Sequence, residues 1–359
     1  MKLRDAILWP LSLPYEMVTR LHARAYRSGF FPQRKLDAFV ISVGNLTVGG
    51  TGKTPMVLWI AEHLVAEGKS VGILTRGYRG KPSSANATTA DGGADLDTTR
   101  DESTTSDSTS DDSTSDEVRL LKSRLGGSVA FGVGPDRFAN GANLVVRGVK
   151  CFVLDDGFQH RRLARDVDIV LIDATDPFGG GHLLPAGRLR EPRSALGRAG
   201  IIVITRGGHA PAVEAAIRQD SKAPIFYARP QLESVRRLHD RSAVDLANLR
   251  SQKLFAFCGI GNPRAFLVDL REWGFQIAGH KFFPDHHRYT RADALAIESE
   301  ARNAGAAALV CTEKDLFNLR DVPSNSLPVY FCRISFQIDR PDAFWAAIKS
   351  KAPSSDPSA

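Results

Sequence analysis

The sequence predicts an α/β protein: a P-loop domain built on a doubly wound, mostly parallel sheet, followed by a second, smaller α/β domain. Three observations lead to this prediction. A glycine-rich turn, "VGGTGKT" (48–54), lies between a short apolar run and a helical pattern. Apolar runs of strand length then alternate with helical stretches as far as residue 205. A similar alternation resumes after about residue 220.

The N-terminal segment, residues 1–36, combines bulky apolar residues with several arginines. Pro10 and Pro14 predict that this segment is not one continuous helix, because proline lacks a backbone N–H group. A helix from Tyr15 onward would gather apolar residues on one face, with arginines beside them. We therefore expect a membrane-proximal segment on an anionic surface; a core-packed helix with solvated arginines is the alternative.

The glycine-rich turn has the composition of a loop that holds nucleotide phosphates. Residues 38–43 suit a buried strand, and residues 55–64 place their apolar side chains on one helical face. In such loops small residues let backbone N–H groups approach the phosphates, a lysine spans two phosphates and a hydroxyl binds Mg²⁺. The predicted nucleotide-binding residues are Thr47, Gly49, Gly50, Thr51, Gly52, Lys53 and Thr54.

Two further stretches offer ligands for a metal ion and for phosphate. The apolar run 151–157 ends with Asp155 and Asp156, at the strand end where a P-loop protein needs a carboxylate for Mg²⁺. Aspartates that merely cap the next segment are the alternative. The glycine-rich stretch 178–192 is predicted to be a loop at the ligand crevice of the sheet. Its arginines could bind phosphate, and Glu191 could join the Mg²⁺ ligands; solvated surface charge is the alternative.

The length of 359 residues favours two domains. We place the P-loop domain at residues 37–220, the second domain at 221–350 and a disordered tail at 351–359. Residues 82–115, rich in Ser, Thr and Asp, are predicted to be a disordered acidic insertion. The four cysteines form no Cys-x-x-Cys pair, which indicates reduced thiols in a cytosolic compartment.

The charge distribution favours an anionic partner. Residues 91–117 hold ten of the 40 acidic residues and one of the 47 basic ones, so the rest of the chain is more basic than its net charge of +7 indicates. Nucleic acid, anionic lipid and a phosphorylated substrate all fit such a surface. Because no aromatic–basic motif is present, we expect no nucleic-acid partner.

The second unit has its own strand, turn and helix signals. "KLFAFCGIGNP" (253–263) runs from a strand into a glycine turn, and Thr290 can cap a helix over residues 291–303. "FPDHHRYT" (283–290) offers histidines at a strand end, where an imidazole could take a proton from a hydroxyl group. On this stretch alone, a histidine with a structural role is the stronger interpretation.

Taken together, these blocks resemble one family, the tetraacyldisaccharide 4'-kinases of lipid A biosynthesis. The matching stretches run in order from about residue 43 to 315: "VGNLTVGGTGKTP", "TRGYRGK", "VGPDR", "DDGFQH", "GGGHLLPAGRLREP", "FCGIGNP", "FPDHHRYT" and "TEKD". Thr47, where the strict P-loop pattern has a glycine, matches the family.

The resemblance implies an ATP-dependent lipid kinase that uses Mg²⁺. Its acceptor would be the 4'-hydroxyl of an acylated glucosamine disaccharide 1-phosphate, and its product the bisphosphorylated lipid A precursor lipid IVA. The resemblance also implies two α/β/α domains that meet at a cleft, and a peripheral location on the cytoplasmic face of the inner membrane. We expect the protein to be a monomer.

The family's residue roles fall on particular positions of this chain. Lys53 and Thr54 would act on the phosphates and Mg²⁺, with Asp156 and Glu191 near the metal. A catalytic Asp–His pair is implied, with His286 as the histidine. The family's Gly-Asp-Glu-Pro motif is replaced here by "SDEV", so Asp116 is the best counterpart of its aspartate. The candidate substrate-binding residues are Asp155, Gln159, His160, His182, Arg188 and Arg190.

Two other functions share part of this pattern. A membrane-associated P-loop ATPase switch of the partitioning type has a similar glycine-rich loop, but it would need no base for an acceptor. A GTP-binding switch is suggested superficially by "TEKD" (312–315), but Asp315 follows Lys314 directly, so the spacing of the guanine-reading motif fails.

Overall fold

The computed structural model describes residues 3–77, 115–319 and 327–353. Of the predicted acidic insertion, residues 82–115, only Ser115 belongs to the described residues. Strands of the described residues form one 11-stranded sheet in the order β3-β2-β4-β1-β5-β6-β7-β11-β10-β8-β9. Within it the pairing of β7 with β11 is antiparallel, and the remaining pairings between these strands are parallel.

The strands are β1 (Phe39–Asn45), β2 (Val71–Thr75), β3 (Val129–Val133), β4 (Cys151–Asp155), β5 (Val167–Asp173), β6 (Ile201–Thr205), β7 (Ile225–Arg237), β8 (Lys253–Cys258), β9 (Gln276–Phe282), β10 (Ala308–Thr312) and β11 (Val329–Ile338). The helices are α1 (Leu3–Arg27), α2 (Lys53–Ala66), α3 (Asp116–Leu125), α4 (Arg137–Val146), α5 (Pro211–Arg218), α6 (Leu246–Arg250), α7 (Pro263–Glu272), α8 (Arg291–Asn303) and α9 (Pro341–Lys349). Short 3-10 helices occupy Gly126–Ser128, Arg193–Arg198 and Asp315–Asn318.

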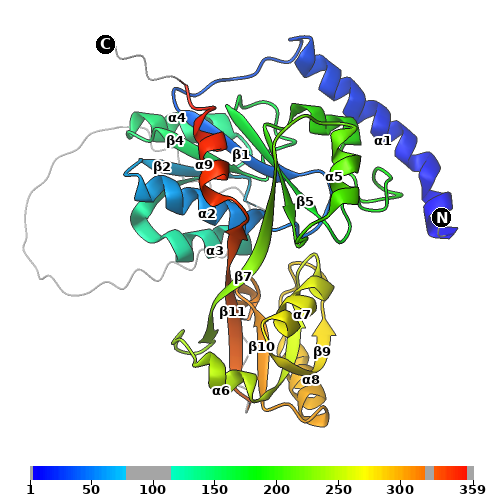
Figure 1. Cartoon of the computed structure of the whole chain (residues 1–359), viewed down its shortest axis with the longest axis vertical. Helices are drawn as coiled ribbons and strands as arrows, with labels where there is room; N and C mark the ends of the chain where they lie inside the picture. The colour runs from blue at the N-terminus through cyan, green and yellow to red at the C-terminus, as the bar shows by residue number, and fades with distance from the viewer. Residues whose placement is uncertain (1–2, 78–114, 320–326, 354–359) are drawn as a thin grey trace, which may run out of the picture.

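Strands β1 to β6 and their helices form the larger part of the molecule, here named the P-loop lobe (Figure 1). β1 lies between β4 and β5, so the chain crosses to the other side of β1 between these two strands. The loops that follow β1, β4 and β5 therefore open at the same edge of the sheet, which is where ligands bind in doubly wound folds. This arrangement confirms the predicted fold class for the first part of the chain.

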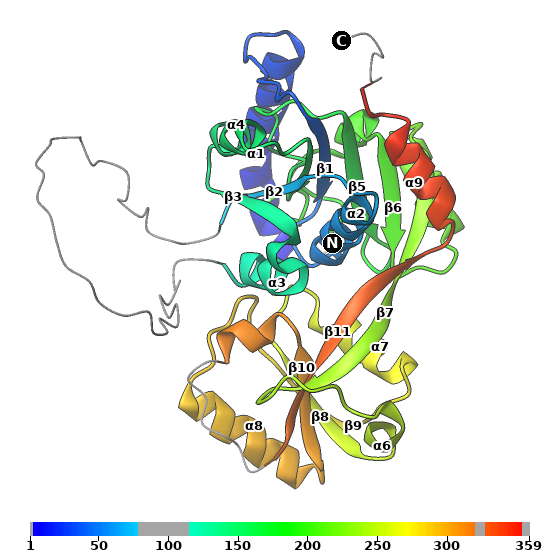
Figure 2. The ribbon, with the colours of Figure 1, turned by 90° about the vertical axis from the view of Figure 1, so that its left-hand side faces the viewer.

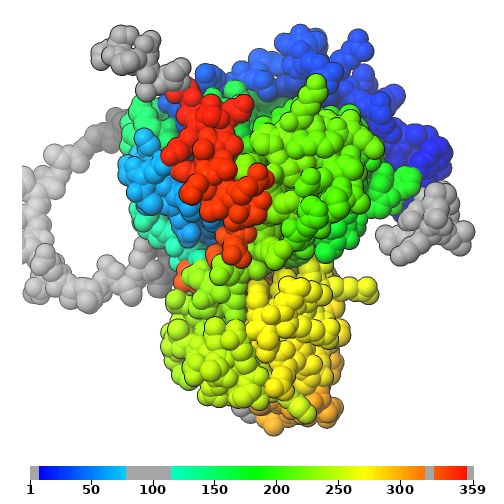
Figure 3. All heavy atoms as spheres, viewed as in Figure 1, coloured from blue at the N-terminus to red at the C-terminus, as the bar shows by residue number. Residues whose placement is uncertain are grey.

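Strands β8 to β10 and helices α6 to α8 form a smaller unit, here named the second lobe (Figures 1 and 3). Separate apolar clusters cover the two faces of its part of the sheet, one around Phe266 and Leu270 and the other around Ile297 and Ala301. Helix α8 is capped by Thr290, as the sequence predicted, and the structure adds a capping box in which Thr290 and Asp293 bond each other's backbone N–H groups. The second, smaller α/β/α part of the fold is thereby confirmed.

Two long strands connect the lobes (Figure 2). β7 pairs with β6 through residues 225–228 and then continues into the second lobe beside β11, which returns in the opposite direction. Although the sequence placed residues up to 350 with the second domain, α9 packs against α2 of the P-loop lobe. There Trp59 contacts Phe344 and Trp345, with ring centroids 5.3 and 5.9 Å apart. Burial of this aromatic surface explains why the chain returns to the first lobe.

The prediction that Pro10 and Pro14 interrupt the N-terminal helix was wrong, because α1 runs through both. A proline removes one hydrogen bond of a helix, and contacts with the P-loop lobe stabilise this helix around the two sites. The Ser12 hydroxyl donates to the carbonyl of Leu183 (3.0 Å), and the Tyr15 hydroxyl donates to that of Arg190 (3.0 Å). α1 thus lies along the outer flank of the P-loop lobe (Figure 1).

Candidate functional site

The glycine-rich turn forms the connection between β1 and α2. Gly52 precedes α2 in the left-handed region, with φ +89°, and no side chain caps the helix there. A Cβ atom at Gly52 would lie 2.4 Å from Cζ of Phe336, so only glycine fits. Because no side chain occupies the first N–H groups of α2, they are available to an anion such as phosphate.

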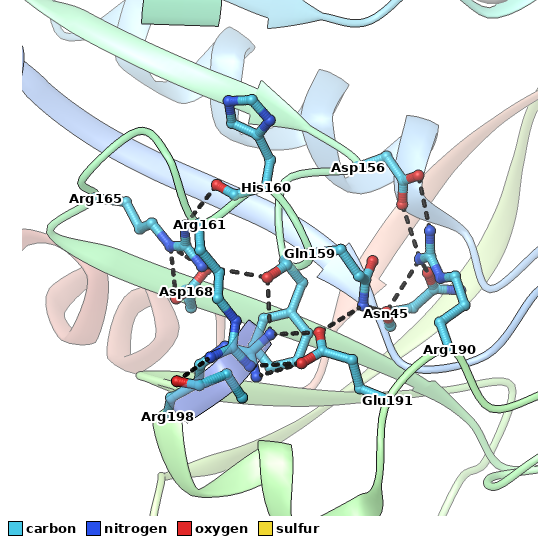
Figure 4. A network of polar contacts seen from close by, with 12 residues as sticks. Asn45, Asp156, Gln159, His160, Arg161, Arg165, Asp168, Arg190, Glu191 and Arg198 are labelled. Atoms are coloured by element: carbon cyan, nitrogen blue, oxygen red, sulfur yellow. Dashed lines mark hydrogen bonds and ion pairs between the residues drawn. The ribbon is translucent and has the colours of Figure 1, made fainter. Parts of the chain in front are cut away.

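Lys53 extends from the first turn of α2 toward the end of β4. Its Nζ lies 3.6 Å from Oδ1 of Asp156 and 3.4 Å from Oδ1 of Asn45. Arg190 donates to both carboxylate oxygens of Asp156 at 2.9 Å and also to Oδ1 of Asn45 (Figure 4). Burial alone would raise the pKa of Asp156, but Lys53 and Arg190 outweigh it and lower that pKa. An ionised carboxylate therefore stands beside the phosphate loop.

Asp155, the neighbour of Asp156, is in a different environment. Its side chain is buried and accepts a hydrogen bond from the Thr75 hydroxyl at 3.4 Å. Burial raises the pKa of Asp155 to about 7, and the carboxylates of Glu117 and Asp156 add to this effect. Because Asp155 is buried, its predicted contact with substrate stays a prediction.

Glu191 lies in an ion cluster behind the phosphate loop (Figure 4). Its carboxylate oxygens accept hydrogen bonds from Arg161 (2.6 Å) and Arg198 (2.6 and 2.9 Å), and from Gln159 at 3.2 Å. Gln159 also donates to the carbonyl of Asn45 at 3.0 Å. These bonds support the end of β1 from behind, and the expected role of Glu191 near a metal stays a prediction.

The remaining candidate substrate residues lie at three places around the loop. Burial, reinforced by Arg137 and Arg165, lowers the pKa of His160 to about 4, which keeps this imidazole neutral at pH 7. His182 lines a cavity of about 320 Å³ between α1 and the 181–194 loop. The side chain of Arg188 pairs with the carboxylate of Asp176. The backbone N–H of Arg188 donates to the carbonyl of Gly179, and its carbonyl accepts from the N–H of Val48.

The structure brings together Asp116 and His286, the predicted catalytic pair, from the two lobes. Asp116 is the first residue of α3, and His286 lies in the loop after β9. Nδ1 of His286 lies 3.0 Å from both carboxylate oxygens of Asp116. A carboxylate accepts hydrogen bonds, so Nδ1–H donates and Nε2 carries the lone pair that can act as a base.

Each member of the pair shifts the pKa of the other. The hydrogen bond to Asp116 raises the pKa of His286 above its ordinary value, against the opposing effects of burial and Lys314. Burial would raise the pKa of Asp116, but the hydrogen bond with His286 and the charge of Lys314 lower it. Asp116 is therefore ionised, and the pKa of His286 lies above its ordinary value.

Two residues of this site had no role in the sequence prediction. Nζ of Lys314 lies 3.4 Å from Nε2 of His286, and the amide of Asn318 donates to Oδ2 of Asp116 at 3.3 Å. The signal for Lys314 was the "TEKD" stretch, which the family resemblance included without assigning a function; Asn318 follows that stretch and had no signal of its own. Asp315 fixes this stretch in place, because its buried carboxylate accepts from the backbone N–H of Gly259 and the hydroxyl of Tyr289, both at 2.8 Å.

The loop after β8 connects the phosphate loop with the histidine. A Cβ atom at Gly261 would lie 2.7 Å from the backbone nitrogen of Gly50 and 3.2 Å from Oδ2 of Asp285. The next residue, Asn262, donates to Asp173 of the P-loop lobe at 3.1 Å. A cavity of about 1090 Å³ opens beside this contact. Gly261 therefore lies between the phosphate loop and the loop that carries Asp285 and His286.

The donor atoms at the phosphate loop fit Mg²⁺ bound together with a nucleotide. Among the described residues, no three His, Cys, Asp or Glu side chains are placed to hold a metal ion by themselves. Mg²⁺ does not require such a cage, because it is commonly held by one or two carboxylates together with phosphates and water. The carboxylate of Asp156 and the hydroxyl of Thr54, both at the loop, are ligands of this kind.

Comparison with known proteins places the chain among lipid A kinases. The sequence model of the tetraacyldisaccharide-1-P 4'-kinase family matches residues 4–353. The tetraacyldisaccharide 4'-kinase of Geobacter metallireducens is 39% identical over 346 residues, which cover 96% of this chain and 97% of that one. The enzyme of that name from Pelobacter propionicus is 39% identical over 311 residues, covering 86% of this chain and 82% of its own length.

A solved structure agrees with this assignment. The crystal structure of LpxK from Aquifex aeolicus in complex with ATP has a TM-score of 0.69 to this fold at 28% sequence identity. The similarity covers 97% of this chain and 99% of the Aquifex chain. The resemblance drawn from the motifs is confirmed: the chain is a kinase and belongs to the tetraacyldisaccharide 4'-kinase family.

Proposed function

We propose that this kinase transfers the γ-phosphoryl group of ATP to the 4'-hydroxyl of tetraacyldisaccharide 1-phosphate, giving lipid IVA. The observation that carries the proposal is the Asp116–His286 pair, because the loop that carries His286 approaches the phosphate loop at Gly261. A P-loop protein that only hydrolyses ATP as a switch needs no such base for an acceptor. The pair therefore favours a transferase over the partitioning-type ATPase.

The chain's own groups perform three tasks in this reaction. The first N–H groups of α2 and the ammonium of Lys53 bind the phosphates and offset negative charge that develops during transfer. His286, oriented by Asp116, accepts the proton of the 4'-hydroxyl at Nε2. The freed oxygen bonds to the γ-phosphorus while the bond from that phosphorus to the β–γ bridging oxygen breaks, and ADP leaves.

Thr54 and Asp156 would hold Mg²⁺, with Glu191 as the further expected ligand. Bound there, the ion would offset part of the negative charge of the phosphates. The ion pairs of Asp156 with Lys53 and Arg190 keep its carboxylate ionised and in place before nucleotide binds. Closure of the two lobes would exclude water, which otherwise competes with the sugar hydroxyl as acceptor.

A product assay tests the proposal directly. The protein is incubated with ATP, Mg²⁺ and tetraacyldisaccharide 1-phosphate, and the lipid fraction is analysed by mass spectrometry. We expect a product heavier by one phosphoryl group, formed in equal amount to ADP. ADP formation that is independent of the disaccharide, with no phosphorylated lipid, would instead indicate the ATPase switch.

We also propose that α1 binds the anionic cytoplasmic face of the inner membrane, where the acylated substrate resides. Apolar side chains of and near this helix are exposed: Trp9, Leu11, Leu13, Met17, Val18, Leu21, Phe30 and Phe31. Arg24 and Arg27 lie in the last turn of α1. None of the helices in the described part of the chain is long and apolar enough to cross a bilayer. This combination supports peripheral attachment through α1.

Replacing Val18 and Leu21 by serine should weaken binding to anionic vesicles by at least tenfold. Both side chains are about 60% exposed, and transfer of each into the lipid interface is worth on the order of 1 to 2 kcal/mol. Co-sedimentation with phosphatidylglycerol-containing liposomes measures the effect. The control is Val146→Ser, which changes an exposed valine on α4. Equal binding of all three proteins, or binding that salt does not weaken, would contradict attachment through α1.

A further inference from the structure

Lys314 lies at the point where the two lobes meet around His286. Its ammonium is 3.1 Å from Asp285 and 3.4 Å from Nε2 of His286, both in the loop after β9. It is also 3.6 Å from Glu117 and 3.8 Å from Asp116, at the start of α3. Only 18% of the side chain is exposed. Lys314 is therefore a partly buried cation shared by carboxylates of both lobes.

These carboxylates keep Lys314 charged. Burial alone would lower the pKa of the lysine, but Glu117, Asp116 and Asp285 outweigh it and raise that pKa. The ammonium consequently donates to Nε2 of His286, since an ammonium has no lone pair to accept with. Nε2 is the same atom that must take the proton of an acceptor hydroxyl. Lys314 thus occupies, in the free protein, the hydrogen-bonding position of the substrate hydroxyl.

We propose that Lys314 is a positioning residue that holds Nε2 of His286 unprotonated until a substrate hydroxyl replaces it. This inference rests on the proposed role of His286 as the base. The imidazole of His286 lies 3.0 Å from the carboxylate of Asp116 and 3.8 Å from that of Asp285, with the ammonium of Lys314 beside it. Without Lys314, these two negative charges would favour the imidazolium, which cannot accept a proton.

The carboxylates around Lys314 also offer its ammonium alternative partners when a substrate hydroxyl binds to Nε2 of His286. A shift of the ammonium away from Nε2 can be taken up by Asp285 and Glu117, which it already contacts. After the proton has passed from the hydroxyl to Nε2, the neighbouring ammonium repels the new imidazolium and favours its return to the neutral form. No further reactant is required, because the proton leaves to solvent after product release.

The same contacts join the lobes on the catalytic side of the cleft. Glu117 and Asp116 belong to the P-loop lobe, whereas Lys314, Asp285 and His286 belong to the second lobe. The position of Lys314 beside His286 therefore depends on contact between the lobes. Separation of the lobes would remove the carboxylates of Asp116 and Glu117, which hold the ammonium in place. Arginine at this position would keep the charge, whereas methionine would keep only the length of the side chain.

NMR titration of the imidazole signals of the full-length, ligand-free protein tests the inference without using activity. His286→Ala identifies the signal of His286. In Lys314→Met we expect the pKa of His286 to rise by about 1 to 2 pH units, because a cation in contact with the ring has been removed. Lys314→Arg should restore it to within about 0.5 unit. Lys281→Met, which removes a surface lysine paired with Glu300, should leave it unchanged.

An unchanged pKa of His286 in Lys314→Met overturns the inference. If that variant does not fold by circular dichroism, Lys314→Gln provides the same test with a polar side chain. The pH dependence of kcat separates this result from the proposed function. We expect the acidic limb of Lys314→Met to move to higher pH by the same 1 to 2 units, with the rate recovering above it. A raised pKa by NMR with no movement of the limb would support the effect of Lys314 on the protonation of His286 and contradict His286 as the base.

Discussion

Replacing Lys53 by alanine should reduce kcat for phosphoryl transfer by at least 10² to 10³ while the protein stays folded. Lys53 belongs to none of the apolar clusters, and its ammonium contacts Asp156 and Asn45 rather than core side chains. Its loss removes charge stabilisation of the transferring phosphoryl group, not packing. Steady-state kinetics with saturating ATP, together with the thermal unfolding midpoint, measure both parts of the prediction.

Lys69→Ala is the matched control for this experiment. Lys69 is an exposed lysine of the same lobe, in the connection from α2 to β2. We expect this variant to keep the kcat of the unmodified protein. Near-normal turnover in a folded Lys53→Ala protein would contradict the assignment of the phosphate loop.

Replacing either member of the Asp116–His286 pair by alanine should reduce kcat by a similar factor, on the order of 10² to 10⁴. The two side chains are joined by a hydrogen bond of 3.0 Å, so each depends on the other to present Nε2 to the acceptor. The double variant should therefore be little slower than the slower single variant. ATP affinity, measured by nucleotide binding in the absence of lipid, should change little.

The control is His280→Ala, which removes an exposed histidine of β9 in the same lobe. Losses that multiply in the double variant would mean that Asp116 and His286 act independently. Full activity in Asp116→Ala would transfer the orienting role to another acid. Asp285, the neighbour in sequence, is poorly placed for it, because its carboxylate lies 3.8 Å from Nε2 rather than beside Nδ1.

The sequence predicts the local elements of this fold well, because their signals are local. Strand β1, the turn at Gly52 and helix α2 follow from an apolar run, glycines and a helical period. The helix capped by Thr290 is likewise determined by side chains within one turn. The long strands β7 and β11 were not predicted, because their polar middle sections lack a continuous apolar pattern. These sections pair with each other although they lie far apart in the sequence, as Tyr330 with Arg237 and Ile338 with Ala228.

For the site, the sequence predicts residue types but not partners. Lys53 and Asp156 were expected near one another, and the structure places them 3.6 Å apart. The arginine cluster around Glu191 could not be foreseen, because Arg161 and Arg198 reach it through the packing of separate loops. Lys314 was missed for a similar reason: its importance comes from the charges of α3, which lie far away in sequence.

The return of β11 and α9 to the P-loop lobe has a consequence for biosynthesis of the protein. Phe336, Ile338 and Phe344 belong to the same apolar cluster as Ile41 and Val153, which precede them by about 200 to 300 residues. A ribosome extends the chain by about 5 to 20 residues each second, so the early strands wait many seconds for these partners. The P-loop lobe is therefore the first to begin folding on the ribosome and the last to complete its core. Its final partners are synthesised only after the second lobe, which is inserted into its sequence.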